Sequence, residues 1–151
     1  MTSKRESLQI LVREIRLDIE DYQQLRALLR HQRSLLERRD QQALNQHNER
    51  VESLCNKLRD RAARRTATLK QLGVSPDANG MQRLFGALGP QSRHTVTSLW
   101  NHLQQLVRDC QVENELNGKL LAGQKSLLDR VLGGAHADAE HQDYGADQPV
   151  S

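Results

Sequence analysis

Apolar residues recur every seven positions through the first quarter of the chain. The main row is Leu8, Ile15, Tyr22, Leu29 and Leu36, and a second row is Leu11, Val12, Ile19, Leu25 and Leu28. Polar Arg, Glu and Gln residues fill most of the outer positions. A stripe with this spacing predicts a coiled-coil-like helix over residues 4–37 that begins near Ser3 or Ser7. At 1.5 Å per residue that helix would be about 50 Å long.

A second apolar seam begins after the first loses its phase near Asp40, a residue suited to cap a new helix. The seam consists of Leu44, Val51, Leu58 and Leu72, with Leu54, Cys55, Ala62 and Leu69 beside it. This pattern predicts a helix over residues 41–72. Arg65 stands on the seam, and His47 and Asn48 follow Leu44, so we expect loose packing at these points.

Residues 73–80 contain glycine, proline, serine, aspartate and asparagine, which together end a helix and allow the chain to reverse. A short connector helix is expected over residues 81–88, where Met81, Leu84, Phe85 and Leu88 could close the end of a bundle. Gly89 and Pro90 end the connector. A last helix is expected over residues 92–132, with a seam of Val96, Leu99, Trp100, Leu103, Leu106, Val107, Cys110, Leu120, Leu121, Leu127, Leu128, Val131 and Leu132.

Together these patterns predict an all-α protein. We expect an elongated antiparallel three-helix bundle over residues 1–134, coiled-coil-like, followed by a flexible C-terminal tail over residues 135–151 that lacks periodicity. Composition agrees, because aromatic residues make up 3% of the 151 residues and charged residues 27%. Few aromatics favour long helices over a compact core, and little β-structure is expected.

Charge is unevenly distributed along the chain. Residues 1–72 hold 16 Lys and Arg against 10 Asp and Glu, whereas residues 73–151 hold 6 against 9. The cluster of Arg59, Arg61, Arg64 and Arg65 could contact phosphate, which makes a basic nucleic-acid-binding regulator one alternative function. Interleaved acidic residues and the lack of aromatics in this stretch favour a solvated helix face instead. We therefore expect no nucleic-acid partner.

The sequence carries no pattern typical of a catalytic or metal-binding site. The sequence contains no Gly-rich phosphate loop, GxSxG, HExxH or CxxC element. His136 and His141 stand near acidic residues but fit no defined metal spacing, so we expect no metal, no cofactor and no enzymatic activity. Cys55 and Cys110 fall on apolar helix faces, as small buried residues do. No signal peptide or apolar run of membrane-spanning length is present, which predicts a cytoplasmic location.

The end of the chain carries two more specific motifs. Residues 114–124 read N-E-L-N-G-K-L-L-A-G-Q on the last predicted helix, and residues 144–147 read Y-G-A-D in the tail. With the long-helix organisation that precedes them, these motifs resemble the FlgN family of flagellar type III export chaperones. The resemblance covers nearly the whole chain. Its helices and loop are generic, whereas the two C-terminal motifs are far more specific.

The resemblance implies a chaperone that binds hook-associated proteins of the hook-filament junction, prevents their premature assembly and delivers them to the export gate. By motif position it implies a cargo site on the last helix and a docking residue, Tyr144, for the cytoplasmic domain of the export-gate membrane protein. The cargo-binding candidates are Asn114, Asn117, Leu120, Leu121, Gln124, Leu127, Leu128 and Val131. Contact with the export ATPase complex is a further implied partnership.

Helical spacing gives this cargo site some independent support. Leu120 and Leu127, and again Leu121 and Leu128, are seven residues apart, the spacing with which a helix presents anchors to a partner helix. Asn114 and Asn117 would fix the register by hydrogen bonding. The same leucines could instead form an intramolecular core or the seam of a homodimer. A self-associating coiled-coil scaffold is therefore the second alternative function.

Overall fold

The computed structural model describes residues 3–120, and all of its regular structure is helical. Four helices follow in order: α1 over Lys4–Arg38, α2 over Gln41–Gln71, α3 over Ala78–Gly86 and α4 over Pro90–Gly118. These helices confirm the predicted all-α class. The remainder of the last predicted helix, residues 121–132, and the tail lie outside the described residues.

Side chains at the helix starts explain where the elements begin. Ser3 Oγ accepts a hydrogen bond from the Glu6 backbone N–H at 3.1 Å, and Asp40 Oδ1 accepts one from Ala43 at 3.2 Å. Each satisfies an N–H that has no partner within its own helix. Asp77 does the same for Gly80 at 3.1 Å, so α3 begins at Ala78, three residues before the expected position.

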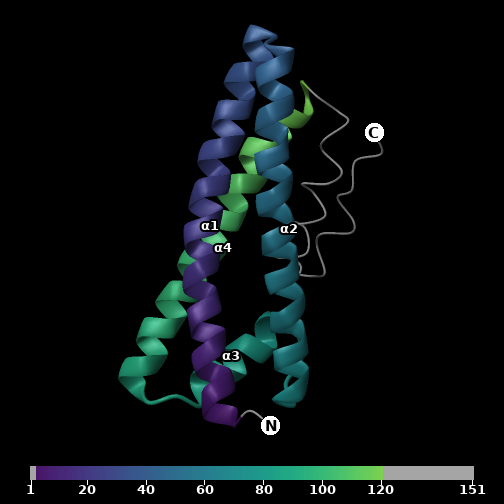
Figure 1. The fold of residues 1–151 in the computed structure, drawn as a ribbon. Coiled ribbons are helices and arrows are strands. Elements are labelled where there is room, and N and C mark those ends of the chain that lie inside the picture. The colour runs from purple at the N-terminus through teal and green to yellow at the C-terminus, as the bar shows by residue number, and fades with distance from the viewer. Residues whose placement is uncertain (1–2, 121–151) are drawn as a thin grey trace.

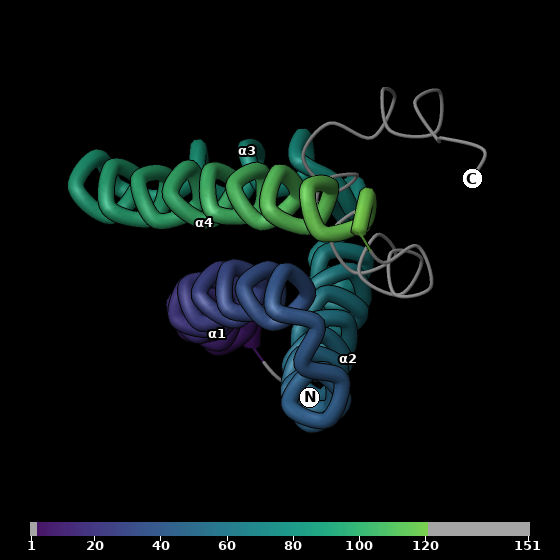
Figure 2. Tube along the Cα trace, turned by 90° about the horizontal axis from the view of Figure 1, so that it is seen from above, coloured from purple at the N-terminus to yellow at the C-terminus, as the bar shows by residue number. Residues whose placement is uncertain are grey.

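The three long helices share one core, with α1 in contact with both α2 and α4. Figure 1 shows α2 returning beside α1 in the opposite direction, and α4 running from the base of the molecule toward the α1–α2 turn. Seen from above, α4 lies across one side of the α1–α2 hairpin (Figure 2). α3 closes the base of the bundle, where Met81, Leu84 and Phe85 are buried.

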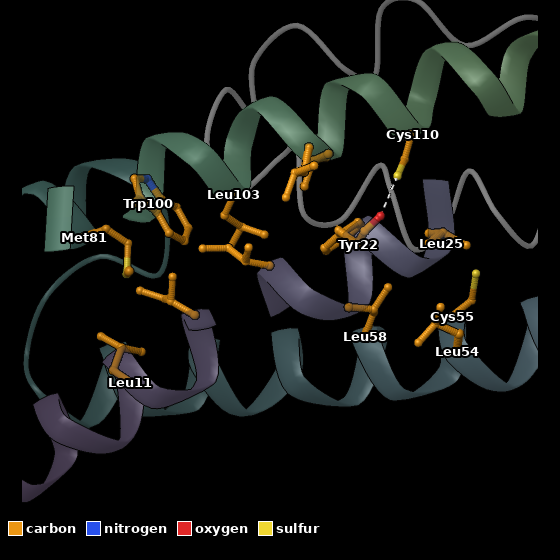
Figure 3. Close-up of a cluster of buried hydrophobic side chains, with 14 of the residues drawn as sticks. Leu11, Tyr22, Leu25, Leu54, Cys55, Leu58, Met81, Trp100, Leu103 and Cys110 are labelled. Carbon is orange, nitrogen blue, oxygen red and sulfur yellow. Dashed lines mark hydrogen bonds between the residues drawn. The ribbon is translucent and has the colours of Figure 1, made fainter. Parts of the chain in front are cut away.

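The core is lined mainly by leucine, with a few larger side chains such as Tyr22, Phe85 and Trp100. Leu11, Met81, Trp100 and Leu103 gather near the base, whereas Tyr22, Cys55 and Cys110 lie farther along the bundle (Figure 3). Phe85 of α3 meets Trp100 of α4 edge to face, with ring centroids 6.4 Å apart. Aromatic pairs prefer this geometry, and it secures the short α3 to the bundle.

The expectation of loose packing at Arg65 is wrong. The Arg65 guanidinium lies 5.5 Å from the centroid of the Trp100 ring, and its Nη1 donates to Asp18 Oδ2 at 2.9 Å. Arg61 Nη1 donates to Asp18 Oδ1 at 2.6 Å and to Asp21 Oδ2 at 2.8 Å. Arg65 is tolerated on the apolar seam because its charge is compensated by a carboxylate of α1 and by the aromatic ring of Trp100 in α4.

His47 and Asn48 are also held in place, although the same looseness was expected of them. His47 Nε2 donates to the Leu28 carbonyl at 2.6 Å, and Asn48 Oδ1 accepts from Gln32 Nε2 at 2.8 Å. Burial lowers the pKa of His47 below its ordinary value, although the hydrogen bond to Leu28 acts in the opposite direction. Polar residues on the second seam therefore join α2 to α1.

Candidate functional site

The C-terminal turns of α4 carry the described part of the predicted cargo site. α4 runs parallel to α1 here: the Cys110 thiol donates to the Tyr22 carbonyl at 3.4 Å (Figure 3). Asn117 Nδ2 donates to the Leu29 carbonyl at 2.6 Å. Both contacts join residues 88 positions apart, so the two helices keep one register over two turns. Burial raises the pKa of the Cys110 thiol to about 12, which keeps it protonated as a donor.

Asn117 belongs to a chain of amide groups that crosses all three long helices. Besides its contact with α1 backbone, Asn117 Nδ2 donates to Gln32 Oε1 at 2.9 Å. Gln32 in turn donates to Asn48 of α2 at 2.8 Å. Buried polar networks of this kind fix the register of helices, because any shift would leave amide groups without partners.

Glu113 fastens the same part of α4 to α1. Its carboxylate accepts from Arg30 Nε at 2.6 Å and from Arg33 Nη2 at 2.7 Å. Burial by itself would raise the pKa of Glu113, but the two charged hydrogen bonds outweigh burial and lower the pKa below its ordinary value. The carboxylate is therefore ionised at neutral pH, and α4 is anchored by charge as well as by its apolar seam.

Apolar side chains emerge on the outer side of these anchored turns. Val112 is 58% exposed, Leu116 43% and Leu120 55%. Val112 and Leu116 stand four residues apart on one side of α4, and Leu120 follows at the same spacing in the turn after the helix ends at Gly118. We call these three residues the α4 stripe. It lies on the side of α4 that does not enter the core, and it leads directly into the leucine-rich residues 121–132.

The structure divides the predicted cargo-binding residues into three groups. Asn114 and Asn117 are 1% and 3% exposed and face the bundle, so a partner has no access to them in this conformation. Leu120 is exposed and lies in the α4 stripe. The others, Leu121, Gln124, Leu127, Leu128 and Val131, lie outside the described residues, as does Tyr144.

Sequence reasoning did not identify Val112 and Leu116 as candidate site residues. Their spacing with Leu120 was a usable signal, since i, i+4 and i+8 define one face of a helix. That signal was overlooked because α4 also has a longer seam of apolar residues, which are buried against the other helices. Only the packing of α4 on α1 shows which of the two faces remains open.

The arginines considered for phosphate binding are mostly engaged within the bundle. Arg61 and Arg65 are buried against Asp18, and Arg64 pairs with Glu14 at 3.2 Å. Arg59 is half exposed and lies 4.0 Å from Asp60. A nucleic acid could therefore reach only part of the cluster, which weakens the prospect of a phosphate site here.

Within residues 3–120, no three metal-ligating side chains converge on a point. His136 and His141, the histidines considered for metal, lie beyond this range. None of the described helices is long and apolar enough to cross a membrane.

Comparison with known proteins agrees with the resemblance drawn from the motifs. The model of the FlgN protein family matches residues 1–149. A solved structure of a flagella synthesis protein, FlgN, from Pseudomonas aeruginosa is similar, with a TM-score of 0.72 and 27% identity over 81% of this chain and 95% of that chain. A search of curated proteins finds no match.

Proposed function

Because this chain belongs to the FlgN family of flagellar assembly proteins, we propose that it is a cytoplasmic export chaperone for hook-associated proteins. In this role it keeps those proteins soluble and unassembled and delivers them to the export gate. It acts by binding and carries out no reaction. The observation that carries the proposal is the α4 stripe, an exposed apolar surface on an otherwise anchored helix.

Cargo binds to the α4 stripe and to the leucines that follow it. The stripe offers three anchors with the spacing of a helix-in-groove contact, and residues 121–132 add Leu121, Leu127, Leu128 and Val131. An apolar helix of the cargo gains about 25 cal/mol for each Å² of apolar surface it buries there. Asn117 supports this surface from behind by holding α4 on α1. Asn114 and Asn117 are both buried, so their direct contact with cargo would require α4 to separate from α1.

Delivery depends on the tail, where Tyr144 docks on the cytoplasmic domain of the export-gate membrane protein. This assignment comes from the position of the Y-G-A-D motif. If it is right, Tyr144→Ala abolishes binding of that domain in a pull-down and leaves cargo binding unchanged. Loss of both activities, or of neither, contradicts it. Contact with the export ATPase complex is proposed from the family resemblance alone.

The cargo proposal is tested by calorimetry with a purified hook-associated protein. Val112→Gln combined with Leu116→Gln removes two anchors without adding charge, and glutamine preserves helix propensity. We expect affinity to fall at least about ten-fold, the equivalent of about 1.4 kcal/mol. Leu17→Gln is the matched control, because Leu17 is a 41% exposed leucine on α1 away from the stripe.

Equal affinities for the double variant and the parent chain would contradict the proposed surface. Sedimentation of the free chain then tests the rival scaffold function. If the parent chain is a dimer and the double variant a monomer, with no cargo bound by either, the stripe is a self-association seam. A salt-dependent interaction with nucleic acid that Arg59→Gln and Arg64→Gln remove would instead favour the basic regulator.

A further inference from the structure

A second apolar surface lies at the base of the molecule, far from the α4 stripe. The first turns of α1 and α4 lie at this end of the molecule, as does α3 (Figure 1). A groove of about 670 Å³ opens between them. Its apolar lining is Leu8, Leu11, Val12, Phe85, Leu88 and Val96. We call this the basal groove.

The lining of the basal groove is continuous with the core. Leu11, Phe85 and Val96 form a buried floor, whereas Leu8, Val12 and Leu88 are only half-buried and form the walls. α3, a helix of nine residues, closes the floor but does not fill the space between α1 and α4. Apolar walls therefore remain in contact with water, and a ligand that covers them gains free energy.

Charge at one end of the groove selects the kind of ligand. Lys4 and Arg5 stand at the rim, and neither forms an ion pair with another residue of the described range. None of the groove's lining residues is acidic; Glu6, in the same turn of α1, is exposed and does not line it. The N-terminus of α1 adds a partial positive charge at the same end. An apolar ligand with an anionic end is therefore complementary.

The dimensions suit a short helix. On α1 the lining extends from Lys4 to Leu11 and Val12, a length of about 12 Å, or roughly two turns. The walls are themselves helices, and a helix satisfies its own backbone polar groups when it enters an apolar groove. We propose that the basal groove binds a two-turn amphipathic helix of a partner protein, whose apolar side chains contact Leu8, Val12 and Leu88 and whose acidic residues pair with Lys4 and Arg5.

This site goes beyond the proposed cargo function, because it uses a different face and a different chemistry. Val96 and Val112 are 16 residues apart on α4, which places the groove and the stripe about 24 Å apart along the helix. One chain could then hold cargo on the stripe and a second, acidic partner at its base. A negative result for one proposed site does not affect the other, so the two proposals are tested separately.

The test uses the full chain and two synthetic peptides, measured by fluorescence anisotropy. One is a stapled helix of about 14 residues with leucines on one face, at the spacing of helix-in-groove anchors, and glutamates beside them. The other has lysine in place of each glutamate. We expect the acidic peptide to bind at least about ten-fold more tightly at low salt, because charge complementarity separates the two.

Three variants locate the site. Lys4→Glu combined with Arg5→Glu changes only exposed side chains and should reverse the preference, so that the lysine peptide binds more tightly. Leu8→Gln should weaken both peptides by about ten-fold, since it removes an apolar wall. Leu116→Gln, in the α4 stripe, should change neither affinity.

Other results would overturn the proposal. Equal binding of both peptides, no binding of either, or no effect of the rim variant would exclude an acidic helix. Binding of dodecanoate, abolished by Leu8→Gln, in place of the peptide would identify a site for an anionic lipid. A change in the sedimentation coefficient of the free chain on Leu8→Gln would identify the occupant as a second copy of this chain.

Discussion

At the scale of single residues, buried charge joins α2 to α1 in one layer of the bundle. Asp18 accepts from both Arg61 and Arg65, and all three side chains are almost fully withdrawn from water. Such a group contributes little net stability while complete, because desolvation offsets the attraction between the charges. Loss of one member is costly, since the others stay buried and charged with less compensation.

Asp18→Asn should therefore destabilise the fold by about 3 kcal/mol, because two buried guanidinium groups would lose their shared carboxylate. The measurement is urea unfolding followed by the fluorescence of Trp100, the single tryptophan of the chain. Asp60→Asn is the control, since Asp60 is exposed and its ion pair with Arg59 is long, at 4.0 Å. The effect of this variant on the free energy of unfolding should stay within about 0.5 kcal/mol. Similar losses of stability for both variants would show that the buried ion pairs of Asp18 contribute no more than an exposed one.

Glu113 should make the free energy of unfolding depend on pH. Its pKa in the folded chain is lowered, so its contribution is complete above the ordinary pKa of 4.5 and is lost as the pH falls through the folded value. Denaturation at a series of pH values should thus show a gap between the parent chain and Glu113→Gln at pH 7 that narrows below about pH 4.5. A gap that stays constant across this range would contradict the assignment.

At the scale of elements, α3 is fixed by a close approach of backbone to backbone. A Cβ built on Gly80 would collide with the Ser75 carbonyl, so the loop before α3 can fold onto the helix only at a glycine. Asp77 reinforces this turn, since its Oδ1 accepts from the Ser75 hydroxyl at 2.7 Å as well as from Gly80. The position of α3 in turn sets the floor of the basal groove.

Gly80→Ala should destabilise the chain by about 1–3 kcal/mol, because the new methyl group must displace the loop backbone. Gly86→Ala, in the same helix, is the matched control: a Cβ there meets nothing within 4 Å. Alanine favours a helix over glycine, so this control should be neutral or slightly stabilising. Thermal unfolding by circular dichroism compares the two. Equal effects would mean that the loop adapts without strain.

At the scale of the whole molecule, α1 is the shared partner of two helices that run in opposite directions. It packs against α2 on one side and against α4 on another. Residues such as Leu11 and Leu103 lie in the resulting common core and depend on more than one pair of helices. The α1–α2 hairpin is therefore incomplete by itself.

A fragment of residues 1–72 should consequently fail to form a stable monomer. Leu11, Ile15 and Tyr22 are buried in a core to which α4 contributes, so removal of α4 would expose part of each side chain to water. We expect the fragment either to unfold or to self-associate, as judged by circular dichroism and sedimentation at several concentrations. A monomeric fragment with cooperative unfolding would show that the hairpin is an independent unit.

Much of this architecture could be predicted from the sequence because helices depend on local spacing. The periodic seams of α1 and α2 and the caps at Ser3 and Asp40 involve residues within a few positions of one another. The start of α3 was misjudged because its cap, Asp77, lies inside a stretch that resembles loop throughout. Arg65 was misjudged because its partners, Asp18 and Trp100, come from other helices.

The candidate site was only partly predictable for the same reason. The motif around Asn114 and Asn117 drew attention to the C-terminal end of α4, but the sequence did not show the direction in which these side chains point. Val112 and Leu116 were overlooked, since a periodic pattern does not show which face of a helix its neighbours cover. The basal groove has no counterpart in any local pattern, because three separate helices form it.

The sequence by itself determined the helices, their order and the family, since hydrophobic period, caps and the C-terminal motifs are all local properties of the chain. The tertiary structure alone decided which polar residues are buried and which apolar residues remain open. That division depends on contacts such as Asp18 with Arg65 and Asn117 with the Leu29 carbonyl, which join positions 47 and 88 residues apart. Burial is a property of neighbours in space, so a one-dimensional pattern cannot assign it.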